Sequence, residues 1–593
     1  MTKRIETFLH RHADLCALCC ALMMVVAAPY LIPENPDSAT FRSGTLGFIL
    51  LCACALPVCH ALRRHTLREI AYGCLFAWIF ALCLGLGSEL TAYDGLLPGM
   101  GSAVRRLAVP FLAAPYLGAL ASFLFAARPL RQISERKAIP FAAFFALFAL
   151  CYGLVLLALF PGVISYDFEH EIAQFTTGEY NAAHPVFHTL FLGSLYALGE
   201  RLLGSMTAGA ALYSLVQLLI LAALYAYACT FVQRRVPRAV TLALAACFAL
   251  LPFHGVLAVS TAKDPLFGGL SVLLCLSLWE MAEDPDAFLH SRRKCARLTL
   301  VSLFMGLLRH NALFAVIPAC LATVILCRNL RLKALRLCAL ALACCLLIPQ
   351  ALVFAVDAQK VPSSELMSVP CQQLMRTAAR ANVSDEEYEE LSAWFSGEVQ
   401  RYRPHCADPA KGGNFDLERF QEDPGAFFAM YLRYGAAYPR IYLEAFLENS
   451  VGLWNPDDLS HAHALSTEEY DYIYLNTVYS YDSDRYPIVS NSLLPPLQRL
   501  LYAFTHHSVQ QRYPLLAQLF CPATYSFLCL LCALLLLCRR QGRFALCLMP
   551  MAGLFISILF SAGVFVRYAY PLMACAPVLL ALSLARPAPE DVA

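Results

Sequence analysis

The chain has 593 residues, of which 59% are apolar and 15% are charged, and its formal net charge at pH 7 is +2. The nearly balanced charge excludes the strongly basic surface that a nucleic-acid-binding protein needs. The mean hydropathy of +0.58 is high, and apolar runs of about 20 residues recur, each long enough to cross about 30 Å of hydrocarbon as a helix. The composition therefore predicts an all-α polytopic membrane protein.

Fourteen apolar segments are predicted to cross the membrane, in chain order at residues 14–33, 45–62, 69–88, 107–127, 139–160, 205–232, 239–258, 265–282, 297–308, 311–327, 335–355, 521–538, 544–563 and 569–585. Basic clusters between them mark cytoplasmic ends, because lysine and arginine are enriched in cytoplasmic loops. The even number places both termini in the cytoplasm. Segments 297–308 and 311–327 are short and close together, so they are two crossings, one long tilted helix or a re-entrant pair, and 12 to 14 transmembrane helices are expected.

Four parts follow from this arrangement. Residues 1–138 form four N-terminal transmembrane helices, and residues 139–355 form a transmembrane module whose first outer loop is 161–204. Residues 356–515 are polar and rich in tyrosine, and they are predicted to form a mainly α exoplasmic domain large enough for its own core. Residues 516–593 hold the last three transmembrane helices and a short cytoplasmic tail.

Two cysteines lie well inside the predicted exoplasmic domain, Cys371 and Cys406. An exoplasmic compartment is oxidising, which permits a disulfide. The sequence is equally compatible with a disulfide between them and with two free thiols.

Four clusters of polar residues beside the ends of the predicted helices fall on the predicted exoplasmic side. They are Asp167 and Glu169 after segment 139–160, Lys263 and Asp264 after 239–258, Arg309, His310 and Asn311 after 297–308, and Arg567 and Tyr568 near the start of 569–585. Two acids in a loop are either ordinary solvated carboxylates or groups that hold a divalent cation or a proton. An arginine within an apolar stretch needs an anionic partner such as phosphate or carboxylate, whereas one at a membrane interface can simply extend to water.

The segment from Ser165 to Thr189 reads SYDFEHEIAQFTTGEYNAAHPVFHT. An acidic pair after a transmembrane helix, followed by Gly-x-Tyr and then by His-Pro at the start of a helix, resembles the first outer loop of the GT-C glycosyltransferases. These are multi-span enzymes that use lipid-phosphate sugars. Many of them have Asp-Glu and His-Pro-Pro-Leu where this chain has Asp-Phe-Glu and His-Pro-Val-Phe.

A second resemblance covers more of the chain. The motifs PGVISYDFEHEIAQ, HPVFHT, STAKDPLF, LLRHNA, SVPCQQLMRTAA, ADPAK and VRYAYP lie between residues 161 and 571. Together they are similar to a bacterial membrane family known as domain of unknown function 6020. In that comparison the core module begins at the segment 139–160, and the four preceding helices are additional.

The GT-C resemblance implies an integral-membrane glycosyltransferase in the bacterial cell membrane. It would move a sugar from a polyprenyl-phosphate donor to an exoplasmic acceptor, which is a cell-envelope glycan, a lipid or a protein. Membrane lipids are further expected partners, and nucleic acid is not.

The resemblance also implies roles for the polar residues. Asp167 is the first choice for the carboxylate that takes the acceptor proton, and Glu169 is the second. Cations near the membrane surface would stabilise the leaving phosphate. The donor-phosphate candidates are Lys263, Arg309 and Arg567, and the other substrate-binding candidates are His184, His188, His310, Asn311 and Tyr568. The sequence indicates no definite cofactor and leaves a divalent metal ion open; if such an ion takes part, Asp167, Glu169 and His184 would hold it.

Two other functions are compatible with the sequence. A transporter or flippase of lipid-linked saccharides would also be polytopic, but it predicts ionisable residues near the bilayer midplane and two related halves. This chain instead has its polar clusters at one face and a large outer domain. A surface-glycan polymerase or ligase is chemically close to a glycosyltransferase, and the sequence does not separate the two.

Overall fold

The computed structural model of the protein describes residues 2–31, 45–130, 138–165, 167–360, 366–395, 402–412, 414–457, 488–505 and 509–585. These residues form α-helices joined by short turns and 3-10 helices, and their extended segments pair only through four isolated bridges. The prediction of an all-α protein is confirmed.

Within the described residues, nine helical segments are long and apolar enough to cross a membrane. They are α2 (Ala13–Leu31), α4 (Leu67–Tyr93), α5 (Met100–Ala126), α6 (Phe141–Ala158), α9 (Met206–Val232), α12 (Asp264–Glu283), the segment Arg328–Ala355 that contains α16 (Arg331–Ala355), the segment Gly542–Leu559 that contains α28 (Gly542–Ala545) and α29 (Met549–Leu559), and α30 (Val566–Ser583). The protein is therefore a multi-pass membrane protein, as predicted, whereas the number of 12 to 14 helices stays a prediction.

Several apolar segments are broken or short. Helices α10 (Arg238–Leu250) and α11 (Pro252–Ala258) meet at a bend of 57° and would form a tenth crossing together, because Pro252 cannot donate the hydrogen bond that a straight helix needs there. α14 (Arg292–Leu308) and α15 (Leu313–Leu326) are separate helices, since Arg309 between them is extended with φ −149° and ψ 138°. α27 (Pro522–Cys538) is a short apolar helix.

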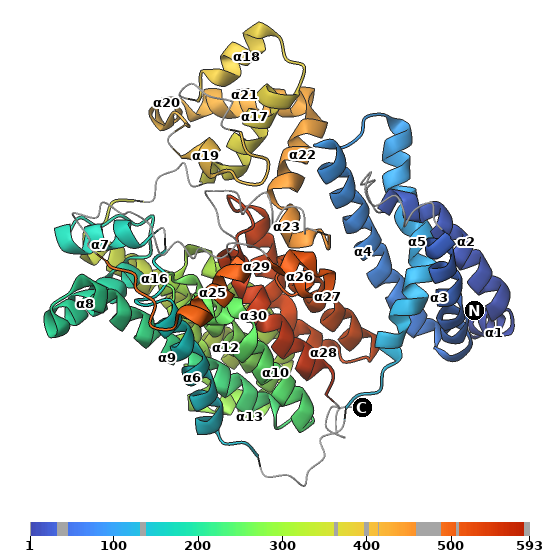
Figure 1. Ribbon diagram of the computed structural model, residues 1–593, viewed down its shortest axis with the longest axis horizontal. Helices are drawn as coiled ribbons and strands as arrows, with labels where there is room; N and C mark the ends of the chain where they lie inside the picture. Colours follow the sequence, from blue (N-terminus) through green and yellow to red (C-terminus); the bar gives the residue numbers. More distant parts are fainter. Residues whose placement is uncertain are drawn as a thin grey trace.

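The N-terminal helices form a bundle of their own, seen in blue at one side of Figure 1. α1 (Thr2–Arg11), α2, α3 (Thr45–Arg64), α4 and α5 pack together there. α4 begins with a capping box between Thr66 and Glu69. Gly73 and Gly118 let α4 and α5 approach closely, because a Cβ atom added to Gly73 would lie 2.3 Å from the Gly118 carbonyl oxygen.

The polar segment folds into a helical layer above the apolar helices (Figure 1). Its helices are α17 (Ser368–Arg380), α18 (Asp385–Ser392), α19 (Asp408–Lys411), α20 (Leu417–Glu422), α21 (Pro424–Ala437) and α22 (Pro439–Asn449). They enclose a separate core that includes Leu374, Trp394 and Phe427. Cys371 and Cys406 are buried free thiols, so the structure has no disulfide between them.

Backbone and side-chain contacts fasten this layer to the apolar helices. The Ala407 amide donates to the Ala562 carbonyl at 2.6 Å, and Asn449 Nδ2 donates to the Ser561 carbonyl at 2.8 Å. On its other side, buried Arg376 donates to the Asp94 carbonyl between α4 and α5 at 2.8 Å. The polar layer is therefore held at two places, one on the turn before α30 and one on the N-terminal bundle.

The remaining short helices connect these parts. α7 (Phe168–Thr177) and α8 (Val186–Leu203) follow α6, and α13 (Pro285–His290) precedes α14. α23 (Val451–Trp454), α25 (Pro495–Thr505) and α26 (Pro514–Gln518) lead from the polar layer to α27.

Candidate functional site

The motif that begins at Asp167 folds into the short helix α7. Asp167 is its N-cap residue, and Glu171 lies four residues later, which places both carboxylates on one face of the helix. α7 ends at Gly178, whose φ of 76° is the left-handed conformation that terminates helices. The chain then returns to His184, and Pro185 is the N-cap residue of α8. This return brings the imidazole of His184 back over the two acids.

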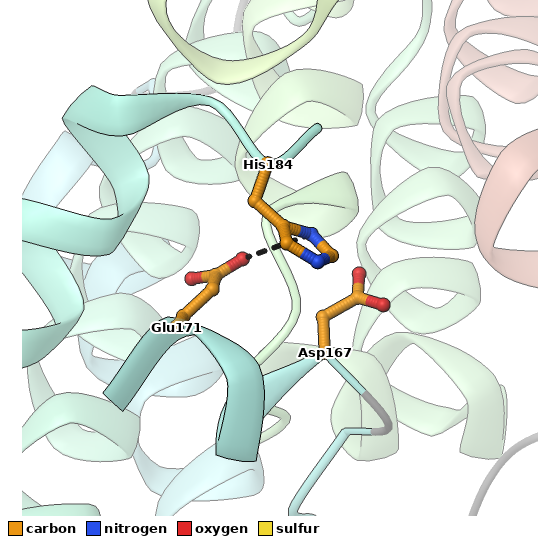
Figure 2. Close-up of side chains that lie close together, drawn as sticks. All are labelled: Asp167, Glu171 and His184. Carbon is orange, nitrogen blue, oxygen red and sulfur yellow. Dashed lines mark ion pairs between the residues drawn. The ribbon is translucent and has the colours of Figure 1, made fainter. Parts of the chain in front are cut away.

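Asp167, Glu171 and His184 lie close together and face one another (Figure 2). One ligand atom from each of the three lies within 4.8 Å of the other two. The His184 Nδ1 atom is 3.9 Å from Glu171 Oε1. Two carboxylates and an imidazole are a donor set that can hold a divalent cation.

Lys263, the residue before α12, contacts all three members of this cluster. Its Nζ atom is 2.9 Å from Asp167 Oδ2, 3.3 Å from Glu171 Oε1 and 3.3 Å from His184 Nδ1. Backbone pairing sets this position, because the Val163 amide donates to the Val259 carbonyl and the Thr261 amide donates to the Val163 carbonyl, both at 2.9 Å. Two loops that are almost 100 residues apart in sequence are thereby held side by side.

The charges in the cluster stabilise one another. Burial favours the neutral form of Asp167, but the neighbouring Lys263 and Arg567 charges outweigh it and hold the pKa of this carboxyl well below its usual value. The same balance lowers the pKa of Glu171, where the charges of His188 and Lys263 outweigh burial. Burial alone would lower the pKa of Lys263, but the two carboxylates raise it. Asp167, Glu171 and Lys263 are therefore ionised at neutral pH, whereas burial and the Lys263 charge lower the pKa of His184 and keep its imidazole neutral.

A buried chain of hydrogen bonds fixes Glu171 from behind. His188 Nδ1 lies 2.5 Å from Glu171 Oε2, and His188 Nε2 lies 2.8 Å from the Tyr213 hydroxyl. Tyr213 donates to Gln217 Oε1 at 2.9 Å, and Gln217 Nε2 donates to the Ser260 carbonyl at 2.5 Å. All four side chains are buried. His188 therefore orients Glu171 rather than facing solvent.

A cavity of about 1020 Å³ opens in front of this cluster, between the apolar helices and the polar layer. Its charged lining residues are Lys263, Arg309, Arg403, Lys411 and Arg567 on one hand and Asp167, Asp264 and Asp408 on the other. Five cations and three anions leave an excess of two positive charges, with histidines counted as neutral. The cavity is suited to an anionic ligand.

Two guanidinium groups flank an aromatic ring inside the cavity. The Arg309 and Arg567 guanidinium carbons lie 4.7 and 5.0 Å from the centre of the Tyr568 ring. Arg309 also forms an ion pair with Asp264, whose side chain is 1% exposed. Arg567 Nη1 is 3.2 Å from Asp167 Oδ2. Guanidinium groups are the preferred partners of phosphate, because their N–H groups match its oxygens in pairs.

Most of the predicted site residues meet in this cavity. Its lining includes Asp167, His184, Lys263, Arg309, His310, Asn311, Arg567 and Tyr568. His188 is buried behind the cavity, and the half-buried Glu169 is not among the lining residues. Asp264, which precedes Pro265, is the first residue of α12 and an ion-pair partner of Arg309.

The predicted metal set of Asp167, Glu169 and His184 needs a correction, because Glu171 takes the place of Glu169. In a helix, residues two apart point to different sides, and residues four apart point to the same side. The sequence carried this signal, since Gly178 ends a ten-residue helix that begins next to Asp167. In a loop, by contrast, the spacing of the acids does not indicate which of them lies on the same side as Asp167.

The opposite wall of the cavity comes from the polar layer and was not predicted. It includes Tyr402, Arg403, Asp408 and Lys411, with Lys411 Nζ 3.4 Å from Asp408 Oδ1. Asp408 and Lys411 belong to the motif ADPAK. That motif was visible in the sequence, but no transmembrane helix next to it indicated a position at the site.

Comparison with known proteins adds a family. Neither a curated protein nor a solved structure matches the chain. A family model described as a family of unknown function, DUF6020, matches residues 141–592 and leaves out the N-terminal helices α1 to α5. This match covers about three quarters of the chain, from α6 onward, and includes every residue of the cluster and of the cavity wall. The chain therefore belongs to the family of unknown function DUF6020.

Proposed function

We propose that the protein is an integral-membrane glycosyltransferase that moves a sugar from a polyprenyl-phosphate donor to a cell-envelope glycan, a lipid or a protein. One observation carries the proposal: a carboxylate, Asp167, and two guanidinium groups, Arg309 and Arg567, line one cavity at the boundary between apolar helices and a polar layer. A lipid-linked substrate needs such a boundary, because its chain must stay in the bilayer while its phosphate and sugar are in a polar space.

The proposed reaction is a single displacement at the anomeric carbon. An acceptor hydroxyl oxygen attacks that carbon, the bond from carbon to the phosphate oxygen breaks, and the hydroxyl proton passes to Asp167. Among the described residues, both contacts of Asp167 engage Oδ2, from Lys263 and Arg567, so Oδ1 is the oxygen proposed to take the proton. A positioned base contributes roughly 10²- to 10⁴-fold to a rate, and the low pKa of Asp167 places its contribution toward the lower end of that range.

The leaving phosphate gains charge as its bond to the sugar breaks. Fixed cations therefore stabilise the transition state more than the bound substrate. We assign this role to Arg309 and Arg567, which flank Tyr568 in the cavity. Lys263 donates to Asp167, Glu171 and His184, and we propose that it holds these groups rather than the phosphate.

The donor assignment is tested by native mass spectrometry of protein extracted gently from its own membrane. We expect a co-purified polyprenyl-phosphate sugar that is retained about 10- to 100-fold less by Arg567→Gln, since a charge-assisted hydrogen bond contributes roughly 1.5–3 kcal/mol. The matched control is Arg433→Gln on the polar layer, an exposed arginine paired with Glu390. Equal retention by both variants would remove Arg567 from the phosphate site, and an unphosphorylated solute in place of the lipid would favour transport.

The same proposal places both termini in the cytoplasm and residues 356–515 outside the cytoplasm, so that the cavity faces the compartment that holds the acceptor. A cysteine introduced at exposed Glu386 of α18 should react with a membrane-impermeant maleimide in intact cells. A cysteine at exposed Lys333 of α16 should react only after lysis. The reverse pattern would rule out a lipid-phosphate donor on the proposed face.

A further inference from the structure

The cluster of Asp167, Glu171 and His184 has the composition of a metal site. Two carboxylate oxygens and one imidazole nitrogen within 4.8 Å of one another are ligands that Mn²⁺ and Zn²⁺ accept. The cation among the three groups is either such a metal ion or a cationic side chain.

Lys263 already meets all three groups. An ammonium group has three N–H donors and no acceptor, and the Lys263 Nζ atom has one contact with each member of the cluster, at 2.9 Å, 3.3 Å and 3.3 Å. Because the ammonium only donates, Nδ1 of His184 must accept, and the proton of the neutral imidazole is then on Nε2. All three donors of the ammonium are used by the same groups that would ligate a metal.

We propose that the ammonium group of Lys263 is the permanent cation of this cluster and takes the place of a divalent metal ion between Asp167, Glu171 and His184. The inference concerns the chemistry of the cluster and holds whatever substrate enters the cavity. It predicts that the native site neither binds nor needs a divalent ion.

Position and charge both support this assignment. The backbone pairing of Val163 with Val259 and Thr261 holds the base of Lys263 beside α7, and its side chain is 11% exposed. The two carboxylates, Asp167 and Glu171, already pair with Lys263, Arg567 and His188. A divalent ion added to this set would have to displace the ammonium or lie against it, and like charges in contact repel strongly.

The experiment uses the full-length protein in detergent and Mn²⁺ alone, detected by the loss of the free-ion electron paramagnetic resonance signal. Native protein and Glu171→Gln should give the same weak, non-stoichiometric binding. Lys263→Ala should gain one bound Mn²⁺, with an affinity at least 10-fold higher than the native protein, and Lys263→Ala combined with Glu171→Gln should lose it again. Lys411→Ala, which removes another lysine of the cavity, is the matched control and should show no gain.

Two results would overturn the assignment. One is stoichiometric Mn²⁺ binding by the native protein that Glu171→Gln abolishes. The other is a folded Lys263→Ala variant, as judged by its melting temperature, that gains no ion. The first comparison needs no Lys263 variant, so it decides the question even if Lys263→Ala does not fold.

Discussion

Replacing Asp167 by asparagine is expected to lower the rate of sugar transfer by about 10²- to 10⁴-fold. Asparagine has nearly the same volume as aspartate, but its amide does not accept the proton of the acceptor hydroxyl. Asp167 lines the cavity and lies between the Lys263 ammonium and the Arg567 guanidinium, at 2.9 and 3.2 Å. The measurement is the initial rate of transfer from a polyprenyl-phosphate sugar in proteoliposomes.

Glu169→Gln is the matched control for this substitution. Glu169 is two residues from Asp167 on the same helix, but it is not among the residues that line the cavity, so its variant should keep the native rate. Melting temperatures of both variants separate loss of chemistry from loss of fold, since Asp167→Asn removes an ion-pair partner of Lys263 and Arg567. A folded Asp167→Asn variant with more than a tenth of the native rate would remove Asp167 from the proposed chemistry.

The apolar helices could be predicted well because a membrane leaves the backbone few choices. Within hydrocarbon every N–H and C=O group must bond inside its own segment, so a long apolar run becomes a helix. The predicted segments 139–160 and 205–232 correspond to α6 at Phe141–Ala158 and α9 at Met206–Val232. Segment 239–258 is instead two helices that meet at a bend of 57° before Pro252. Hydropathy did not predict this bend, because it reports whether a segment is apolar and not the direction of the helix axis.

The polar site could be predicted only in part. Helix ends on one side of a membrane lie near one another, so Lys263, Arg309 and Arg567 were expected on the same face as Asp167. The pairs they form depend on contacts that no local pattern encodes, such as the bridge between Val163 and Ser260. The wall contributed by Asp408 and Lys411 depends on how the polar layer docks, through the Ala407 amide and the Ala562 carbonyl.

Replacing Arg376 by methionine is expected to destabilise the polar layer by about 3–5 kcal/mol, the usual cost of removing one partner from a buried charge network. Arg376 is fully buried and contacts Glu444 at 3.1 Å and Glu448, as well as the Tyr402 hydroxyl at 3.0 Å. Methionine fills part of the space but leaves both carboxylates without the guanidinium. Hydrogen exchange of α17 and α22 in the intact protein measures the local free energy of opening.

The control for this variant is Arg433→Met, on the same layer. Arg433 pairs with Glu390, but the two side chains are 59% and 43% exposed, and exposed ion pairs contribute only about 0–1 kcal/mol. Transfer should also fall in Arg376→Met, because Tyr402 bonds to Arg376 and lines the cavity. Equal destabilisation by the two variants would show that the Arg376 network does not hold the layer.

The network also makes the polar layer sensitive to pH, because one guanidinium faces two carboxylates. Burial raises the pKa of Glu448 from 4.5 to about 7; Arg376 opposes this shift, and Asp94 and Glu444 add to it. The folded state therefore holds this proton more tightly than the unfolded state. The stability that this proton contributes is fully present below about pH 4.5 and is lost as the pH rises through about 7. The free energy of unfolding thereby falls by about 3 kcal/mol.

Glu448→Gln isolates this contribution, because the amide stays neutral at every pH. The variant should lose the decrease in local stability between pH 5 and pH 8 and be more stable than the native protein at pH 8. Hydrogen exchange of α22, corrected for the pH dependence of chemical exchange, measures both effects. If the variant keeps the native slope, the titrating group lies outside the network, and the shared guanidinium of Arg376 is sufficient for both carboxylates in their ionised form.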